Sequence, residues 1–157
     1  MTFNDDPAGG QARLRELSAA VRDGATHDDP ALVAALLAEP ERLMAESVLV
    51  ELVDRRGEAL HSAAAFGAWA QPVLDMVGAD GFVGRRVHEW SLFKALQSGG
   101  GPVSRDQLAA ASNWLQRKVA EEAGSAAVLA VLGEVGRTKR LRNVAKTRAG
   151  RLRSPGR

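Results

Sequence analysis

Apolar residues recur along most of this chain at intervals of three and four, the spacing that places them on one face of an α-helix. The first such segment, residues 11–23, carries Leu14, Leu17 and Val21 and is followed by Gly24, a residue type that commonly ends helices. No segment shows the sustained alternation of polar and apolar residues that is typical of a half-buried strand. The pattern therefore predicts an all-α fold, either a bundle or a short right-handed stack of helical hairpins.

Start and stop signals divide the rest of the chain into further helices. Asp28 and Pro30 predict a helix start, because aspartate accepts hydrogen bonds from free N–H groups and proline lacks the N–H that would need one. Ser104 and Thr138 are expected to cap two later helices. The helices expected after the first span residues 30–37, 41–56, 58–70, 73–77, 82–97, 104–123, 125–134 and 138–148, with stops at Pro40, at Gly57 and before Pro72 and with Leu152 as the furthest end.

The domain organisation follows from the same pattern. Residues 11–152 are expected to form one domain, between a flexible lead of residues 1–10 and a flexible basic tail of residues 153–157. The helix of residues 82–97 should be central, because its apolar residues cover more than half of its circumference. The glycine-rich segment 98–103 is a candidate hinge between two subassemblies.

Three segments share one rhythm of a short apolar helix, a break at Pro or Gly, and a longer helix. They are residues 30–56, 73–97 and 126–150. At an offset of 55, the second and third segments share five identities in a window of about fifteen positions. These identities indicate either an internal repeat or chance matches among frequent residue types.

The stretch VLAVLGEVGRTKRLRNVAKTR, residues 128–148, resembles a HEAT-like helical hairpin. The second helix of such a hairpin carries an aliphatic–Arg–x–x–Ala element, which Leu141, Arg142 and Ala145 supply here. The resemblance is best over residues 126–150 and implies stacked helical hairpins. It also implies a protein-binding scaffold, although some members of the family bind the DNA backbone.

Residues for catalysis are few. The chain has no cysteine, which excludes disulfides, thiolate metal sites and cysteine nucleophiles. The histidines, His27, His61 and His88, fall in different segments. The pair His88-Glu89 begins like a zinc-protease motif, but Leu92 stands where the second histidine would be. We therefore expect no enzyme, no cofactor and no metal site.

The location is expected to be cytoplasmic. The first residues lack the basic and apolar regions of an export signal, and no apolar run reaches the ~18 residues that span a membrane.

The tryptophans, Trp69, Trp90 and Trp114, lie in apolar helices and are interpreted as core anchors. An exposed tryptophan would instead indicate base stacking or a partner contact.

Charge is segregated along the chain, although the net charge is only +2. Residues 1–80 contain 6 basic and 14 acidic side chains, whereas residues 81–157 contain 15 basic and 5 acidic ones. This asymmetry indicates an anionic partner, or docking between acidic and basic halves. Arg outnumbers Lys by 17 to 4, as in proteins from high-GC bacterial genomes, so arginine content alone does not indicate nucleic-acid binding.

The C-terminal segment carries the strongest functional signal, with nine basic residues and no acidic one from Arg137 to Arg157. On a helical wheel the expected packing face consists of Leu141, Val144, Ala145 and Leu152. The predicted basic stripe on the opposite side consists of Lys139, Arg142, Lys146 and Arg153. A stripe of one sign attracts polyanions. The helix dipole is the alternative explanation, because it favours cations such as Lys146, Arg148 and Arg151 near a helix C-terminus.

Together these features predict a non-enzymatic protein–protein interaction module that uses its basic last helix. The expected partner is a protein with an acidic surface or a second copy of the chain, and sequence-independent binding to a nucleic-acid backbone is the alternative. Further candidate binding residues are Arg85, Arg86, Arg117 and Lys118. Membrane binding is not expected, because the basic helix lacks bulky apolar residues.

Overall fold

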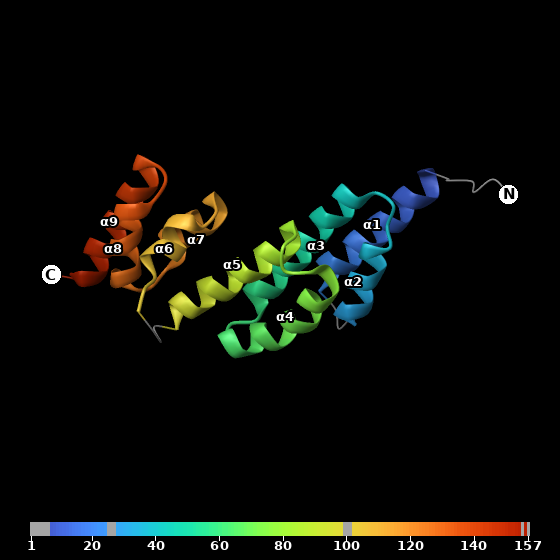
Figure 1. Ribbon diagram of the computed structural model, residues 1–157, viewed down its shortest axis with the longest axis horizontal. Coiled ribbons are helices and arrows are strands. Elements are labelled where there is room, and N and C mark those ends of the chain that lie inside the picture. The colour runs from blue at the N-terminus through green and yellow to red at the C-terminus, as the bar shows by residue number, and fades with distance from the viewer. Residues whose placement is uncertain (1–6, 25–27, 99–101, 155, 157) are drawn as a thin grey trace. The chain divides into compact units, whose positions relative to one another are not determined.

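A computed structural model describes residues 7–24, 28–98, 102–154 and 156 of the chain. Within these residues it contains nine α-helices and no strand, so the predicted all-α fold is confirmed (Figure 1). The helices are α1 (Pro7–Asp23), α2 (Asp29–Leu37), α3 (Arg42–Ala59), α4 (Ala63–Val77), α5 (Phe82–Gln97), α6 (Arg105–Ala110), α7 (Asn113–Glu122), α8 (Ala126–Val135) and α9 (Lys139–Arg153).

The helices form two compact units, Met1–His88 and Glu89–Arg157, and the boundary falls within α5. The first unit carries 8 basic and 14 acidic residues, a net charge of −6, and the second carries 13 basic and 5 acidic residues, a net charge of +8. The charge asymmetry of the sequence therefore coincides with the division into units. The predicted hinge at 98–103 lies after this boundary, and its residues 99–101 are outside the described part of the chain.

In the first unit α1, α2 and α3 pack on one another, and α4 packs on α2. A buried polar network joins three of these helices. Asp29 of α2 accepts hydrogen bonds from Arg56 of α3, at 2.6 Å from Nε and 3.0 Å from Nη2, and from Nε1 of Trp69 in α4, at 2.8 Å. The apolar core around it consists of Leu14, Val21, Leu32, Val33, Leu36, Leu49, Leu52, Val53, Phe66, Ala70 and Val73, with others.

In the second unit α8 packs closely on α9, and α7 contacts both. A Cβ atom on Gly136 would lie only 2.7 Å from Leu141 Cδ2 and 2.9 Å from the Leu132 carbonyl oxygen, so only glycine fits this approach. The fully buried Gln116 of α7 connects further segments, because its Nε2 donates to the Leu108 carbonyl (2.8 Å) and its Oε1 accepts from the Arg137 amide (3.0 Å).

The helix starts that the sequence predicts from capping residues are confirmed. The side chains of Asp28, Ser104 and Thr138 each accept a hydrogen bond from the backbone three residues later. Gly78 ends α4 with a φ of 81°, a left-handed conformation that glycine adopts without strain. The first helix begins at Pro7, four residues before the predicted start.

Two predicted interruptions are wrong, and one interruption is present that the sequence did not predict. Gly57 lies buried inside α3, and Pro72 lies on the exposed side of α4, which continues to Val77. Packing of Val73 on the core offsets the backbone hydrogen bond that proline removes. Conversely, the predicted helix 104–123 is two helices, because Ser112 caps α7 and also donates to Glu89 Oε2 at 2.5 Å.

Candidate functional site

The packing face of α9 differs from the predicted one. Its buried face consists of Ala145, as predicted, and Ala149, which are 0% and 3% exposed, whereas Val144 and Leu152 are 37% and 42% exposed. The reason lies in α8, where Gly133 lets the two helices approach closely: a Cβ atom there would lie 2.7 Å from the Lys146 side chain. Small alanines fit this contact better than branched or long apolar residues, so the helix is rotated from its predicted orientation.

The rotation moves the predicted basic stripe to the border of the packing face. Lys139, Lys146 and Arg153 are exposed, but Arg142 is half-buried, and its Nη1 donates to the Gly136 carbonyl at 2.7 Å. Arg142 therefore has a structural partner within the hairpin of α8 and α9.

Glu134 of α8 is a carboxylate on which the charge of Lys146 acts. Arg105 forms a hydrogen bond with Glu134 of α8 that lowers the pKa of the Glu134 carboxyl group, and its charge lowers that pKa further. The charge of Lys146 makes a smaller contribution in the same direction. The stripe is thus partly explained by contacts within the unit.

The surface opposite the packing face carries other cations. We call it the outer face of α9 and define it as Lys139, which also belongs to the predicted stripe, with Arg140, Asn143, Val144, Thr147 and Arg151. These residues line one shallow depression together with Arg148, which is half-buried and donates to the Ala120 and Ala123 carbonyls. At about 100° per residue, its centre lies about 180° from Ala145 and Ala149. Arg140 and Arg151 are exposed, and neither forms a salt bridge within the described part of the chain.

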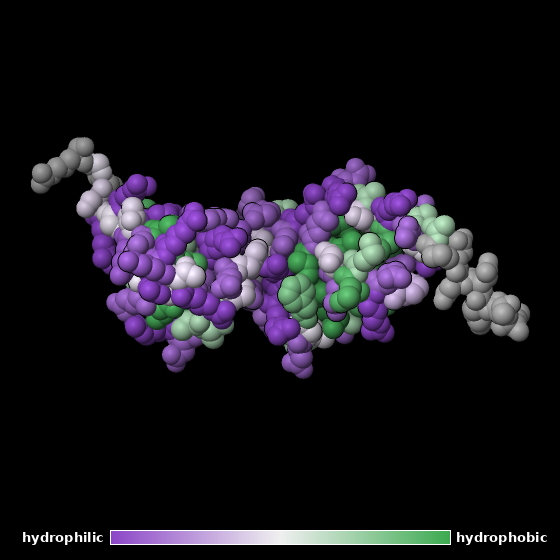
Figure 2. Space-filling view, turned by 90° about the horizontal axis from the view of Figure 1, so that it is seen from above, coloured by the Kyte–Doolittle hydropathy of each residue, from purple (hydrophilic) through white to green (hydrophobic). Residues whose placement is uncertain are grey.

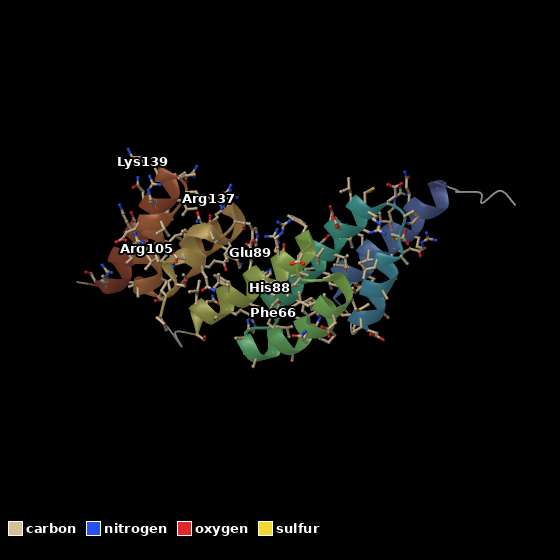
Figure 3. The ribbon with its side chains drawn as sticks, viewed as in Figure 1. Phe66, His88, Glu89, Arg105, Arg137 and Lys139 are labelled. Carbon is tan, nitrogen blue, oxygen red and sulfur yellow. The ribbon has the colours of Figure 1, made fainter. Side chains whose placement is uncertain are left out.

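The N-terminal end of α9 concentrates these cations. Lys139 and Arg140 occupy the first turn, which contains no acidic residue, and Arg137 lies just before the capping Thr138. Figure 3 shows the Arg137 and Lys139 side chains extending away from the ribbon at this end. The helix dipole disfavours positive charge here and favours it at the other end, near Arg151. Helix stability therefore gives no reason for the cations at the start of α9.

The remaining predicted basic residues differ in their surroundings. Arg85 is exposed, whereas Arg86 is half-buried and its Nε lies 3.4 Å from Asp54 Oδ1; both belong to the first unit. Arg117 is exposed on α7 in the second unit. These residues are not combined with the outer face of α9 into one site.

Lys118 is an interior residue, which the sequence pattern did not indicate. Its side chain is only 7% exposed, and its Nζ lies 2.9 and 3.0 Å from the two carboxylate oxygens of Glu122. The same Nζ lies 4.5 Å from the ring centroid of Trp90 and 5.0 Å from that of Phe93, within the range of cation–π attraction. Lys118 therefore stabilises the packing of α5 on α7 rather than presenting charge to a ligand.

The tryptophans serve the interior, as interpreted from the sequence. Trp90 is 2% exposed, and its ring centroid lies 5.5 Å from that of the half-buried Trp114. Trp69 is half-buried and donates to Asp29.

Side chains that could hold a metal ion do not converge. His61 is exposed in the loop between α3 and α4, His88 is exposed on α5, and His27 lies outside the described residues. Among the residues that the structure describes, no three His, Cys, Asp or Glu side chains are grouped closely enough for a metal ion. No helix in the same residues has the length and apolarity required to cross a membrane.

Comparison with known proteins gives no relative for this chain: no protein-family model matches it, and neither a curated protein nor a solved structure matches it. The HEAT-like resemblance therefore depends on residues 126–150 alone and stays a prediction.

Proposed function

We propose that this protein is a non-enzymatic interaction module whose basic second unit docks on an acidic surface of a partner protein through the outer face of α9. The observation that carries the proposal is the exposed cationic start of α9. Lys139 and Arg140 lie where the helix dipole disfavours them, and Arg140 has no carboxylate partner in the described residues. An anionic partner would provide the compensating interaction.

The composition of the outer face favours a protein over a nucleic acid. Val144 lies on this face at 37% exposure, one and two helical turns from Arg140 and Arg151. An aliphatic side chain gains nothing from a phosphate backbone, but it can be buried against an apolar residue of a protein partner. The two guanidinium groups can each pair with a carboxylate through two hydrogen bonds.

Two expectations from the sequence belong to this proposal. A HEAT-like arrangement of hairpins would suit a scaffold that presents α9 to a partner. A cytoplasmic location accords with the absence of cysteine.

Binding to a nucleic-acid backbone is the second candidate, and the net charge of +8 on the second unit supports it. Phosphate contacts would release counterions, so each contact would add about −0.9 to the slope of log affinity against log salt on duplex DNA. A protein interface with apolar burial would depend less steeply on salt.

The experiment compares three labelled probes by fluorescence anisotropy at several salt concentrations. They are a helical peptide of Glu and Leu, a peptide of equal charge with Ser in place of Leu, and a DNA duplex. We expect the Glu/Leu peptide to bind most tightly, and the variant Arg140→Gln/Arg151→Gln to lose about tenfold in affinity for it. Equal affinity for the Glu/Leu and Glu/Ser peptides would show that apolar burial against Val144 does not contribute to binding. Tight binding of the duplex alone, with a steep salt slope, would replace the protein partner by nucleic acid.

A further inference from the structure

The first unit contains a groove between α1 and α3. Its volume is about 520 Å³, and it is lined by Gln11, Leu14, Arg15, Ser18, Arg22, Met44, Ser47, Val48 and Glu51. Four of the α1 residues, Gln11, Arg15, Ser18 and Arg22, are spaced by four, three and four positions, so they lie on one side of the helix and form one wall of the groove. From Gln11 to Arg22 this wall is ~16 Å long, or about three helical turns.

The floor of the groove is apolar and one wall carries an exposed methionine. Leu14 and Val48 are 5% and 9% exposed, and Met44 is 54% exposed. The preceding residue, Leu43, is 81% exposed and lies outside the lining of the groove. Figure 2 shows hydrophobic residues at the surface of the first unit, among hydrophilic ones. An exposed apolar side chain beside an apolar groove floor is a feature of interaction sites.

Charge is distributed unequally between the two walls. The α1 wall carries Arg15 and Arg22, whereas the α3 wall carries Glu51. Arg22 Nε and Arg55 Nε lie 3.2 and 3.3 Å from the same Glu51 Oε1, so Arg22 has a carboxylate partner at one end of the groove. Arg15 is exposed and forms no salt bridge within the described residues, which leaves one positive charge beside the apolar floor.

We propose that this groove binds an amphipathic helix of a partner protein, with its apolar stripe against Leu14, Met44 and Val48 and an acidic side chain against Arg15. The length of the groove suits about three turns of a helix, whose anchors recur at three and four residues. The uncompensated Arg15 selects an acidic edge on the side of α1. This site lies in the first unit and is independent of the outer face of α9.

A second copy of the chain fits the groove less well. The groove would need an exposed helix with a regular apolar stripe, and α9 offers only two exposed large apolar residues, Val144 and Leu152, where a stripe has three to four in every two turns. A stable dimer also buries on the order of 1,200 Å² or more, and the groove is a smaller feature. The test must therefore distinguish self-association from the binding of a partner helix.

The test uses the full chain with ¹³C-methyl-labelled methionine, because Met44 lies in the groove and Met76 lies on α4 outside it. The probe is a peptide of about 15 residues with Leu at helical spacing and Glu along one edge of the stripe. A matched peptide carries Lys at the Glu positions. We expect the Glu peptide to shift the Met44 methyl signal but not that of Met76, and to bind about tenfold more tightly than the Lys peptide.

Two pairs of variants complete the test by anisotropy. Arg15→Glu should reverse the preference between the peptides, whereas Arg42→Glu, an equal charge change at an exposed position outside the lining, should leave it unchanged. Met44→Ala should weaken binding about fivefold, and Met76→Ala should not. The proposal is overturned if neither peptide shifts Met44 at millimolar concentration, or if Arg42→Glu acts as Arg15→Glu does. A dimer in sedimentation that Met44→Ala dissociates would assign the groove to self-association instead.

Discussion

Replacing Asp29 by alanine should destabilise the first unit severely, because three helices meet at this carboxylate. The side chains of Asp29 and Arg56 are only 10% and 18% exposed, and Asp29 also accepts the Trp69 indole N–H. Alanine at this position would leave the Arg56 guanidinium, and the indole N–H, without their carboxylate acceptor in a largely desolvated site.

The expected loss is about 3 to 5 kcal/mol in the free energy of unfolding, the range found when one partner of a buried ion pair is removed. Trp69→Phe, which keeps the ring and removes one hydrogen bond to a charged group, should cost about 1.5 to 3 kcal/mol. A matched control is the neighbouring Asp28→Ala. Asp28 is exposed and only caps α2, so about 1 kcal/mol should be lost there.

Urea denaturation followed by circular dichroism would measure these losses, with the three variants compared under one set of conditions. Because typical domains are stable by about 5 to 15 kcal/mol, the Asp29→Ala loss is large enough to unfold part of the molecules before denaturant is added. A loss below about 1 kcal/mol, or one equal to that of Asp28→Ala, would refute the reasoning and show that the network contributes no net stability.

Three further predictions concern the second unit. Trp90→Ala should cost about 3 to 5 kcal/mol in urea denaturation, because its 2%-exposed indole fills the core beside α7; a loss below about 1 kcal/mol would contradict burial. Ser112→Ala should cost about 1 kcal/mol through loss of the α7 cap, with a correspondingly lower urea midpoint, whereas Ser112→Asn should retain much of it. Arg105→Gln should raise the pKa of the Glu134 carboxyl group toward its ordinary value, as carboxyl ¹³C NMR titration would detect. Because the pKa of Glu134 is lower in the folded state than in the unfolded state, the stabilisation by this pair is fully present above the unfolded pKa and is lost as the pH falls through the folded pKa. An unchanged Glu134 titration in Arg105→Gln would exclude the Arg105 contact.

Helix starts were the most predictable feature of the fold, because they depend on local chemistry. Asp28, Ser104 and Thr138 each accept a hydrogen bond from the backbone three residues later, so local sequence indicated these starts, whereas the caps at Ser62 and Ser112 were not predicted. Helix interruptions depend on tertiary packing as well. Pro72 remains inside α4 because neighbouring side chains are buried on the core, a contact that no local pattern contains.

The candidate site was predictable as a region but not as a surface. The basic character of the last helix follows from composition, whereas its orientation is set by the close approach of α8 at Gly133 and Gly136. The predicted packing face includes Ala145, which is buried, but it also includes the larger Val144 and Leu152, which are exposed, and it omits the buried Ala149. Small residues on facing helices are the signal that could have indicated the rotation. The charge of Lys118 likewise predicts a surface binding residue, whereas its side chain is buried beside the Trp90 ring and paired with Glu122.

The central claim is that the outer face of α9, and not the predicted stripe, binds an acidic partner. Two variants that remove the same charge test it directly: Arg140→Gln/Arg151→Gln on the outer face, and Lys146→Gln/Arg153→Gln on the stripe. Titrated against the Glu/Leu peptide at one salt concentration, the outer-face variant should lose about tenfold in affinity and the stripe variant less than about threefold. Equal losses would mean that only net charge matters, and a larger loss for the stripe variant would return the site to Lys146 and Arg153.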